Sequence, residues 1–228
     1  MFKLKRKNKK LKLQPKELKS IKNYSMIVKN YDEYIYFQTK KHAGHESENI
    51  RWKEGQIRYI DKTFSKLKRS LKIIDIACGD GVGLFQFKRL NFLNVVGVEL
   101  NKEKSEIAKK IGYEVFNLDM HDLSVFPNNE FDVVYSSHTL EHAFDPSKVL
   151  KAFYRILKKD GRLYVVLPYP DTTLGNIEAH GGKFELGTTI LDKGKTVIKF
   201  FEKHNFSLIK KKVDNFREPE IWISFKKK

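Results

Sequence analysis

The chain has 228 residues, enough for one sizeable α/β domain, whereas two full domains would be cramped. Hydrophobic residues make up 40% of it, so it can bury a core, which excludes a wholly disordered chain. The single cysteine, Cys78, excludes an intramolecular disulfide framework, and no apolar run approaches the ~20 residues of a membrane span. The basic N-terminus lacks the apolar core of a signal peptide, so we expect a cytoplasmic protein.

The net charge of +17 lies mostly in the two tails. Residues 1–23 carry ten Lys and Arg against one acid, and residues 210–228 carry seven against three, whereas 24–209 is nearly balanced. We expect residues 1–23 to form a basic flexible arm. Such an arm can contact phosphates or an anionic membrane surface, but a solvated lysine-rich tail has the same composition and is the simpler interpretation.

The elements expected after the arm begin with an aromatic-rich segment, Tyr24 to Gln38, that packs on a domain, and a helical pattern over residues 46–69. From residue 71, short β-branched runs alternate with helical patterns. The expected strands span 71–77, 94–100, 113–117, 131–136, 161–167, 206–213 and 220–225. The expected helices span 82–90, 102–111, 146–159 and 193–204.

This alternation predicts βαβ units and a mostly parallel sheet, so residues 24–228 are expected to form a single α/β domain. Gly112 marks the end of one helix, and Asp145 followed by Pro146 marks the start of another. Residues 169–192 contain several glycines and prolines without clear periodicity. A loop of this length in a compact domain usually binds or covers a ligand.

The run from Asp75 to Gly83, DIACGDGVG, follows the first strand and opens a helix. Its glycines miss the G-x-G-x-x-G register of dinucleotide sites, and no Lys-Ser/Thr pair follows them, so a P-loop is excluded too. An acid at a strand end would repel a pyrophosphate but suits a ligand with an ammonium group. Ligands of open α/β sheets bind at this edge, so the run predicts such a site.

Glu99 ends the next strand, in the run VVGVE. A carboxylate at this position can accept hydrogen bonds from both hydroxyls of a ribose, as in nucleotide-binding βαβ folds. The alternative is a surface acid that opens the following helix. The glycine-rich loop before it favours ribose binding.

These residues, with Asp119 and the run FDVVYSSHTLEHAFDPSKVLKAFYRILKKDGRLYVVLPYP, resemble the class I S-adenosylmethionine-dependent methyltransferases. The resemblance covers residues 71–168 and is closest to small members with an LEH…DP…L signature. It implies a doubly wound, Rossmann-like, mainly parallel seven-stranded sheet with helices on both faces and the last strand antiparallel. It also implies that residues 71–168 bind S-adenosyl-L-methionine, that 24–69 cap the site and that 169–192 form the substrate loop.

The resemblance assigns site residues position by position. The methionine part of the cofactor would be held by Asp75 and the backbone of Ala77, Cys78, Gly79 and Gly81. The nucleoside would meet Glu99 at the ribose, and Leu100, Asp119, Met120 and the His121 amide at the adenine. The sulfonium end would lie near Ser136. Gln56 and Arg51 would lie above it, on the helix that caps the site. For Arg51, a side chain exposed to solvent is an equal alternative.

Two positions depart from the family pattern. Ala77 stands where the family most often has glycine, and Asp160 stands where it usually has proline. Alanine disfavours a positive φ, so we expect an extended loop at Ala77. Lys159-Asp160-Gly161 still makes a good turn.

The candidate catalytic residues are three histidines, because removing a proton from a hydroxyl or ammonium acceptor requires a base with a pKa near neutrality. His138 and His142 follow the fourth strand, and His180 lies in the long loop. His142 has a structural alternative within the LEH signature, while Glu141 and Tyr135 are weaker candidates. No metal site is expected, because the lone Cys78 has no His/Cys cluster around it and suits packing under the loop.

The sequence therefore predicts an S-adenosylmethionine-dependent methyltransferase acting on a small molecule, with a sugar or surface-polysaccharide precursor preferred. One alternative is an RNA or DNA methyltransferase that uses the basic arm, although the Asn/Asp-Pro-Pro-Tyr/Phe motif of enzymes that act on base amino groups is absent after the fourth strand. The other is a non-catalytic partner subunit that binds the cofactor.

Overall fold

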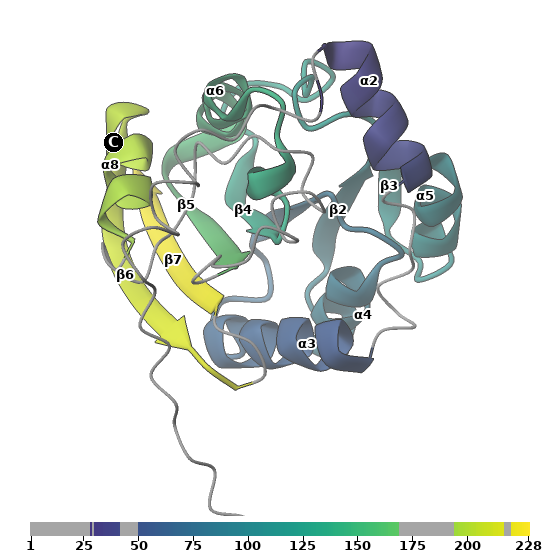
Figure 1. Ribbon diagram of the computed structural model, residues 1–228. Helices are drawn as coiled ribbons and strands as arrows, with labels where there is room; N and C mark the ends of the chain where they lie inside the picture. The colour runs from purple at the N-terminus through teal and green to yellow at the C-terminus, as the bar shows by residue number, and fades with distance from the viewer. Residues whose placement is uncertain (1–27, 29, 42–49, 169–193, 217–219) are drawn as a thin grey trace, which may run out of the picture.

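Seven strands form one sheet in the computed structural model, which describes residues 28, 30–41, 50–168, 194–216 and 220–228 (Figure 1). The strands are β1 (Lys72–Ile76), β2 (Asn94–Glu99), β3 (Glu114–Asn117), β4 (Phe131–Ser137), β5 (Leu157–Pro168), β6 (Phe206–Asp214) and β7 (Glu220–Lys227). Their order is β3-β2-β1-β4-β5-β7-β6. Neighbours from β3 to β5 are parallel, and β7 is antiparallel to both β5 and β6. The predicted mainly parallel sheet with an antiparallel last strand is confirmed.

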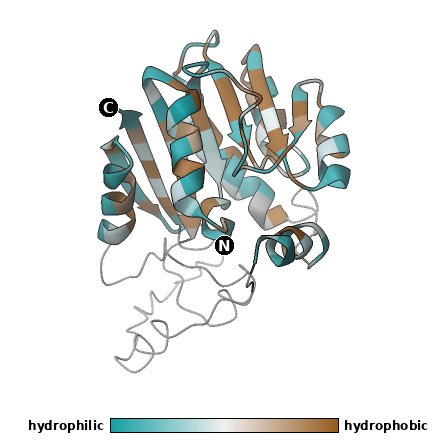
Figure 2. Ribbon diagram, turned by 90° about the horizontal axis from the view of Figure 1, so that it is seen from above, coloured by the Kyte–Doolittle hydropathy of each residue, from teal (hydrophilic) through white to brown (hydrophobic). Residues whose placement is uncertain are grey.

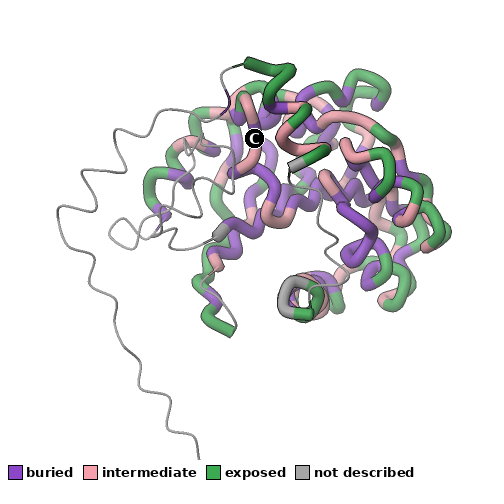
Figure 3. Tube along the Cα trace, turned by 45° about the vertical axis from the view of Figure 1, so that its right-hand side comes forward, coloured by how far each residue is buried: buried purple, intermediate pink, exposed green. Residues whose placement is uncertain are grey.

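Helices cover both faces of the sheet (Figure 1). The helical elements are α2 (Tyr31–Tyr36), η1 (Phe37–Lys41), α3 (Ile50–Phe64), α4 (Val82–Arg89), α5 (Lys102–Lys109), η2 (Leu140–His142), α6 (Pro146–Ile156) and α8 (Lys195–Lys203). Side chains of α3, α4 and α5 belong to one buried cluster, and those of α6 and α8 belong to another. The sheet lies between them, and its strands β1, β2, β4 and β7 are largely buried and rich in apolar residues, whereas most of β6 is exposed (Figures 2 and 3).

Aromatic contacts dominate the cluster under α3 and α4. The rings of Tyr59 and Tyr135 stack with centroids 5.7 Å apart, and Trp222 meets Tyr59 edge-on at 4.9 Å. On the opposite face, Phe201 of α8 stacks on Phe225 of β7 at 4.5 Å. Each large ring removes apolar area from water, so the two clusters fix the helices against the sheet.

Local signals in the sequence located several element boundaries. Gly112 has φ +97° directly after α5, where a glycine accepts the left-handed conformation. The Asp145 side chain accepts a hydrogen bond from the Lys148 backbone N–H at 2.9 Å, and Pro146 occupies the first turn of α6. These two signals behave as predicted.

The predicted helix over 146–159 is wrong at its end. Helix α6 stops at Ile156 because Leu157 pairs with Phe131 of β4. The chain then turns at Asp160, which has φ +65°, and continues β5. The sequence did not predict α2, which lies in the aromatic-rich segment, or η1, which begins there and continues to Lys41. The predicted arm (1–23) and substrate loop (169–192) lie outside the described residues.

The expectation of a negative φ at Ala77 is also wrong. Its φ is +55°, so alanine adopts the left-handed conformation that glycine would adopt more easily. The backbone between β1 and α4 changes direction at Ala77. The backbone N–H of the next residue, Cys78, donates to the carbonyl of Val98 at 3.0 Å. The loop therefore keeps the glycine-type path that the family pattern suggests, at some cost in backbone strain.

Ala77→Gly should raise the free energy of unfolding by about 0.5–1 kcal/mol, because relief of the left-handed strain exceeds the extra entropy that glycine gives the unfolded chain. Thermal unfolding should show a higher midpoint by roughly 2–4 °C per kcal/mol.

Ala152→Gly inside α6 is the matched control, and it should lower stability by about 1 kcal/mol because its backbone is helical. A loss of stability in both variants would contradict the strain at Ala77.

Candidate functional site

The first functional side chain, Asp75, lies near the carboxyl end of β1 and is 1% exposed. Its Oδ2 has no hydrogen-bond partner among the residues that the structure describes. An added Cβ at Gly83 would lie 2.5 Å from this oxygen and 2.9 Å from Nε2 of Gln56. The Asp75 carboxylate and the Gln56 amide therefore both approach Gly83 near the start of α4, where only glycine leaves them room.

Burial raises the pKa of the Asp75 carboxyl well above its ordinary value, and the negative charge of Glu99 raises it further. An isolated carboxylate is costly in such a place unless a cation or hydrogen-bond donor compensates it. A positively charged group beside Asp75 would offset this cost.

Glu99 ends β2 and holds the loop that follows β1. Its Oε2 accepts a hydrogen bond from the Gly79 N–H at 2.9 Å, and its Oε1 accepts one from the Asn101 N–H at 2.8 Å. These two hydrogen bonds tie the loop after β1 to the loop after β2 through one carboxylate. Within the loop, a Cβ at Gly81, where φ is +96°, would lie only 2.2 Å from Cδ1 of Ile111.

Asp119 follows β3 and receives several hydrogen bonds. Its Oδ1 accepts from the His121 backbone N–H at 2.8 Å and contacts Nδ1 of that ring at 2.5 Å, and its Oδ2 accepts from the Tyr31 hydroxyl. Burial raises the pKa of Asp119, but the bonds from His121 and Tyr31 outweigh it, so the net pKa lies below the ordinary value. Nε2 of His121 accepts from the Asp145 N–H at 3.1 Å, which assigns the ring proton to Nδ1.

Helix α2 lies over this end of the sheet (Figure 1), within the region 24–69 that is expected to cap the site. The Tyr34 ring is 4% exposed and meets His121 edge-on at 5.2 Å. The Asn101 amide donates to the carbonyl of Thr39 in η1 at 3.1 Å. Residues 30–41 therefore form a strap across the ends of β2 and β3.

A second polar group lies beyond β4. The backbone N–H of His138 donates to Val166 of β5 at 2.9 Å, and its φ of +51° is left-handed. Its Nε2 lies 3.3 Å from Oε1 of Glu220 and its Nδ1 lies 3.6 Å from Oε1 of Glu141. Glu220 is 82 residues away along the chain, and no sequence motif pointed to it.

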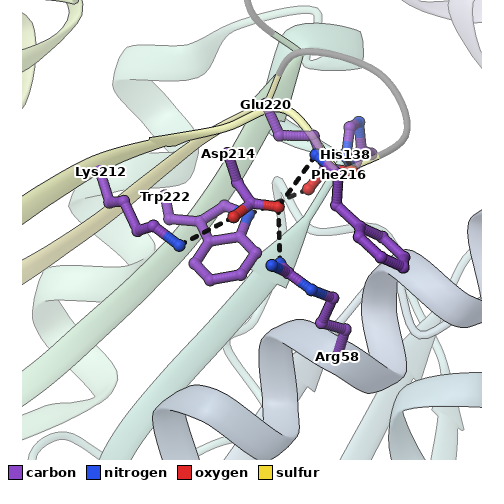
Figure 4. Close-up of polar contacts among 7 residues, drawn as sticks. All are labelled: Arg58, His138, Lys212, Asp214, Phe216, Glu220 and Trp222. Carbon is purple, nitrogen blue, oxygen red and sulfur yellow. Dashed lines mark hydrogen bonds and ion pairs between the residues drawn. The ribbon is translucent and has the colours of Figure 1, made fainter. Parts of the chain in front are cut away.

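Figure 4 shows how β6, β7 and α3 support this group. Asp214 forms ion pairs with Arg58 at 2.6 Å and with Lys212 at 2.8 Å. The Trp222 indole donates to Oε2 of Glu220 at 2.9 Å, which leaves Oε1 facing His138. Burial raises the pKa of Glu220, but the neighbouring His138 and Trp222 outweigh it and lower the pKa overall, so the carboxylate is anionic near neutral pH.

The predicted cofactor residues gather at one edge. The ends of β1 to β4 and the loops that follow them carry Asp75, Ala77, Cys78, Gly79, Gly81, Glu99, Leu100, Asp119, Met120, His121 and Ser136. Gln56 joins them from α3, whereas His180 and the side chain of Arg51 lie outside the described residues. His142 ends η2, beside His138 in the chain, and Cys78 is 4% exposed in the cluster under α4, as its packing interpretation predicts.

The described residues contain neither a metal-binding group of side chains nor a membrane-spanning helix. No group of three or more histidine, cysteine, aspartate or glutamate side chains in them is arranged to hold a metal ion. None of their helices is long and apolar enough to cross a membrane.

Comparison with known proteins gives a consistent family. Residues 74–165 match the family model of the methyltransferase domain. Protein MJ1123 of Methanocaldococcus jannaschii is 30% identical over 141 residues, which cover 60% of this chain and 67% of that protein. Phosphoethanolamine N-methyltransferase of Triticum aestivum is 30% identical over 105 residues, 43% of this chain, and the match spans only 21% of the wheat protein.

The solved structure of PH0226 from Pyrococcus horikoshii has the same fold. It superimposes with a TM-score of 0.62 at 20% identity, covering 85% of this chain and 98% of that one.

Asp75→Asn should stabilise the ligand-free protein at neutral pH but not in acid. The raised pKa means that the folded state favours the protonated carboxyl, so stability is present below the unfolded-state pKa and is lost as the pH rises through the folded-state pKa. Denaturant unfolding of wild type and variant should coincide near pH 4 and diverge by pH 7.5, with the variant more stable.

Asp32→Asn, at an exposed aspartate of α2, is the control and should show no such divergence. Equal stability of wild type and Asp75→Asn at both pH values would contradict the unfavourable burial of the Asp75 charge.

Proposed function

Because the chain belongs to the class I S-adenosylmethionine-dependent methyltransferase family, we propose that it transfers a methyl group from S-adenosylmethionine to a small-molecule acceptor. The observation that carries the proposal is the buried Asp75 carboxylate, whose Oδ2 lacks a hydrogen-bond partner among the described residues and which shares one edge with Glu99 and Asp119. The cofactor is cationic at one end and carries a ribose and an adenine at the other.

The described residues fit this cofactor in chemistry and in order. We infer that Asp75 meets the ammonium group, that Glu99 accepts the ribose hydroxyls, and that Asp119 accepts from the adenine amino group. Bound S-adenosylmethionine supplies an electrophilic methyl group on a sulfonium. The protein's task is to hold an acceptor in line with that group and to take up a proton where the acceptor carries one.

The acceptor is the less defined part of the proposal. The wheat relative is named for a small amine acceptor, which supports a small-molecule substrate. Within that class we propose a sugar or a precursor of a surface polysaccharide, because the resembling family often serves such pathways. The alternative of a nucleic-acid substrate rests on the basic residues 1–23, and the alternative of a non-catalytic partner subunit predicts binding without turnover.

Glu99→Gln and Asp75→Asn should each weaken binding of S-adenosylhomocysteine at least tenfold, equivalent to ~1.4 kcal/mol, because each removes a charged acceptor that contacts the ligand. Isothermal titration calorimetry measures the affinity. Affinity of the wild type should also fall as the pH is lowered through the raised pKa of Asp75, since the protonated carboxyl no longer attracts the ammonium group.

Glu103→Gln on the first turn of α5 is the control for charge removal, and it should leave the affinity unchanged. Wild-type affinity retained in both site variants would remove the basis of the assignment.

Transfer itself is tested with methyl-labelled S-adenosylmethionine and an extract of the producing cells. Label in small, nuclease-resistant and protease-resistant products supports the proposal. Label in RNA or DNA would favour the nucleic-acid alternative, and binding without any labelled product would favour the partner subunit.

A further inference from the structure

Positive charge is concentrated on helix α8 and the neighbouring edge strand β6. Residues 194–216 contain six lysines, no arginine and only two acids, Glu202 and Asp214. Asp214 is already paired with Arg58 and with Lys212, the last lysine of the run. This stretch therefore carries a local excess of positive charge that its own acids do not neutralise.

Three of these lysines form one stripe along α8. Lys195, Lys199 and Lys203 follow one another at intervals of four residues, so they lie on the same side of the helix. All three are exposed, whereas Phe201, on the opposite side, stacks on the sheet. No acid of the described residues forms an ion pair with any of the three. The stripe therefore presents its full charge to the outside of the molecule.

The stripe weakens the helix that carries it. It contains two pairs of like charges at i and i+4, an arrangement that destabilises a helix. Lys195 is also the first residue of α8, where the helix macrodipole is positive, and the first turn contains no acid. Local rules broken in this way without a compensating contact inside the fold are typical of a surface that meets a partner.

Strand β6 extends the positive surface along the edge of the sheet (Figure 1). Residues 208–213, LIKKKV, are all exposed. The Lys211 side chain passes beside the start of α8, since a Cβ added at Gly194 would lie 3.8 Å from its Cδ. We call the α8 stripe together with residues 208–213 the basic face.

Three aliphatic side chains lie among the lysines of β6. Leu208, Ile209 and Val213 are 39%, 48% and 37% exposed. Their strand is poorly suited to pairing with another strand, because its lysines and the shift of register between Leu208 and Lys210 disfavour a further ladder. The basic face is therefore not built to add a strand from a second copy of the chain.

The chemistry of the basic face distinguishes between two anionic partners. Nucleic acids are recognised through the planar fork of arginine and by aromatic rings that stack on bases, whereas the charges here are all lysines and the interleaved side chains are aliphatic. A bilayer with anionic headgroups attracts clusters of four to eight basic residues, and its headgroup boundary accepts aliphatic side chains. The combination favours a lipid surface.

We propose that the basic face binds the surface of a bilayer that contains anionic phospholipid. The lysines lie over the headgroup phosphates, and Leu208, Ile209 and Val213 enter the boundary between headgroups and acyl chains. Strand β6 ends beside Glu220, at the edge of the sheet that carries the candidate site. The bound bilayer therefore borders that edge. This binding is independent of methyl transfer.

The test is sedimentation of the full chain with vesicles made of phosphatidylcholine and phosphatidylglycerol in equal parts. Wild type should bind these vesicles, and it should bind vesicles of phosphatidylcholine alone at least tenfold more weakly. Combined Lys195→Gln, Lys199→Gln and Lys203→Gln should weaken binding roughly tenfold or more, because each lysine adds attraction to the anionic surface. Ile209→Ser should weaken it roughly threefold, because it removes apolar area that enters the boundary.

The matched control for charge is the combination of Lys62→Gln, Lys66→Gln and Lys68→Gln, which removes three exposed lysines at the end of α3 and just after it. It should bind within twofold of wild type. Leu93→Ser, at a side chain that is 75% exposed, is the control for apolar area and should also bind like wild type.

Three outcomes would overturn the proposal. The first is a wild type that does not bind the anionic vesicles. The second is equal weakening by the two triple variants, which would assign the binding to total charge or to residues 1–23, since both variants keep these. The third is tighter binding of a single-stranded oligonucleotide than of vesicles, lost in the α8 triple variant, which would assign the basic face to nucleic acid. Thermal unfolding of the α8 variant should show a midpoint no lower than that of wild type, because the like-charge pairs are gone.

Discussion

The two backbone hydrogen bonds that Glu99 accepts hold the candidate site together. One comes from Gly79, after β1, and the other from Asn101, after β2, so a single carboxylate ties two loops that separate strands place side by side. Only a parallel pair brings two carboxyl ends to the same edge, which is why the βαβ pattern precedes everything else in the site. With the loop fixed, the side chains of Asp75 and Gln56 both lie close to Gly83.

The site holds groups that a core selected for stability alone would avoid. Asp75 is buried although burial disfavours its charged form. Ala77 and His138 have positive φ values although neither is glycine. These groups lower the stability of the fold. The apolar area buried by the aromatic rings on one face of the sheet, and by α6 and α8 on the other, offsets that cost. A buried acid and left-handed backbones at this edge of a well-packed sheet are typical of a binding site.

The sequence predicted what depends on neighbours along the chain. Alternating strands and helices, the Gly112 stop and the Asp145 cap are local, and they were located within a few residues. The end of α6 was missed because Lys158 and Lys159 suit a helix, while the pairing of Leu157 with Phe131 decides the matter from another strand. Helix α2 is too short for a periodic pattern, and it is held by Tyr31 and Tyr34 against residues about 90 positions away.

The same contrast between local patterns and long-range contacts applies to the two parts of the candidate site, the cofactor residues and the group around His138. Apart from Arg51 and Gln56, the predicted cofactor residues lie at the ends of four strands that are consecutive in the chain, β1 to β4, so one contiguous stretch carries their motif. The contact between His138 and Glu220 needs β7, which inserts between β5 and β6 and runs the other way. An antiparallel strand presents its first residue at the edge where its neighbours present their last, and Glu220 is the first residue of β7. The surroundings of His138 are thus set by the order of the strands, and no pattern local to residues 131–142 could have predicted Glu220 beside it.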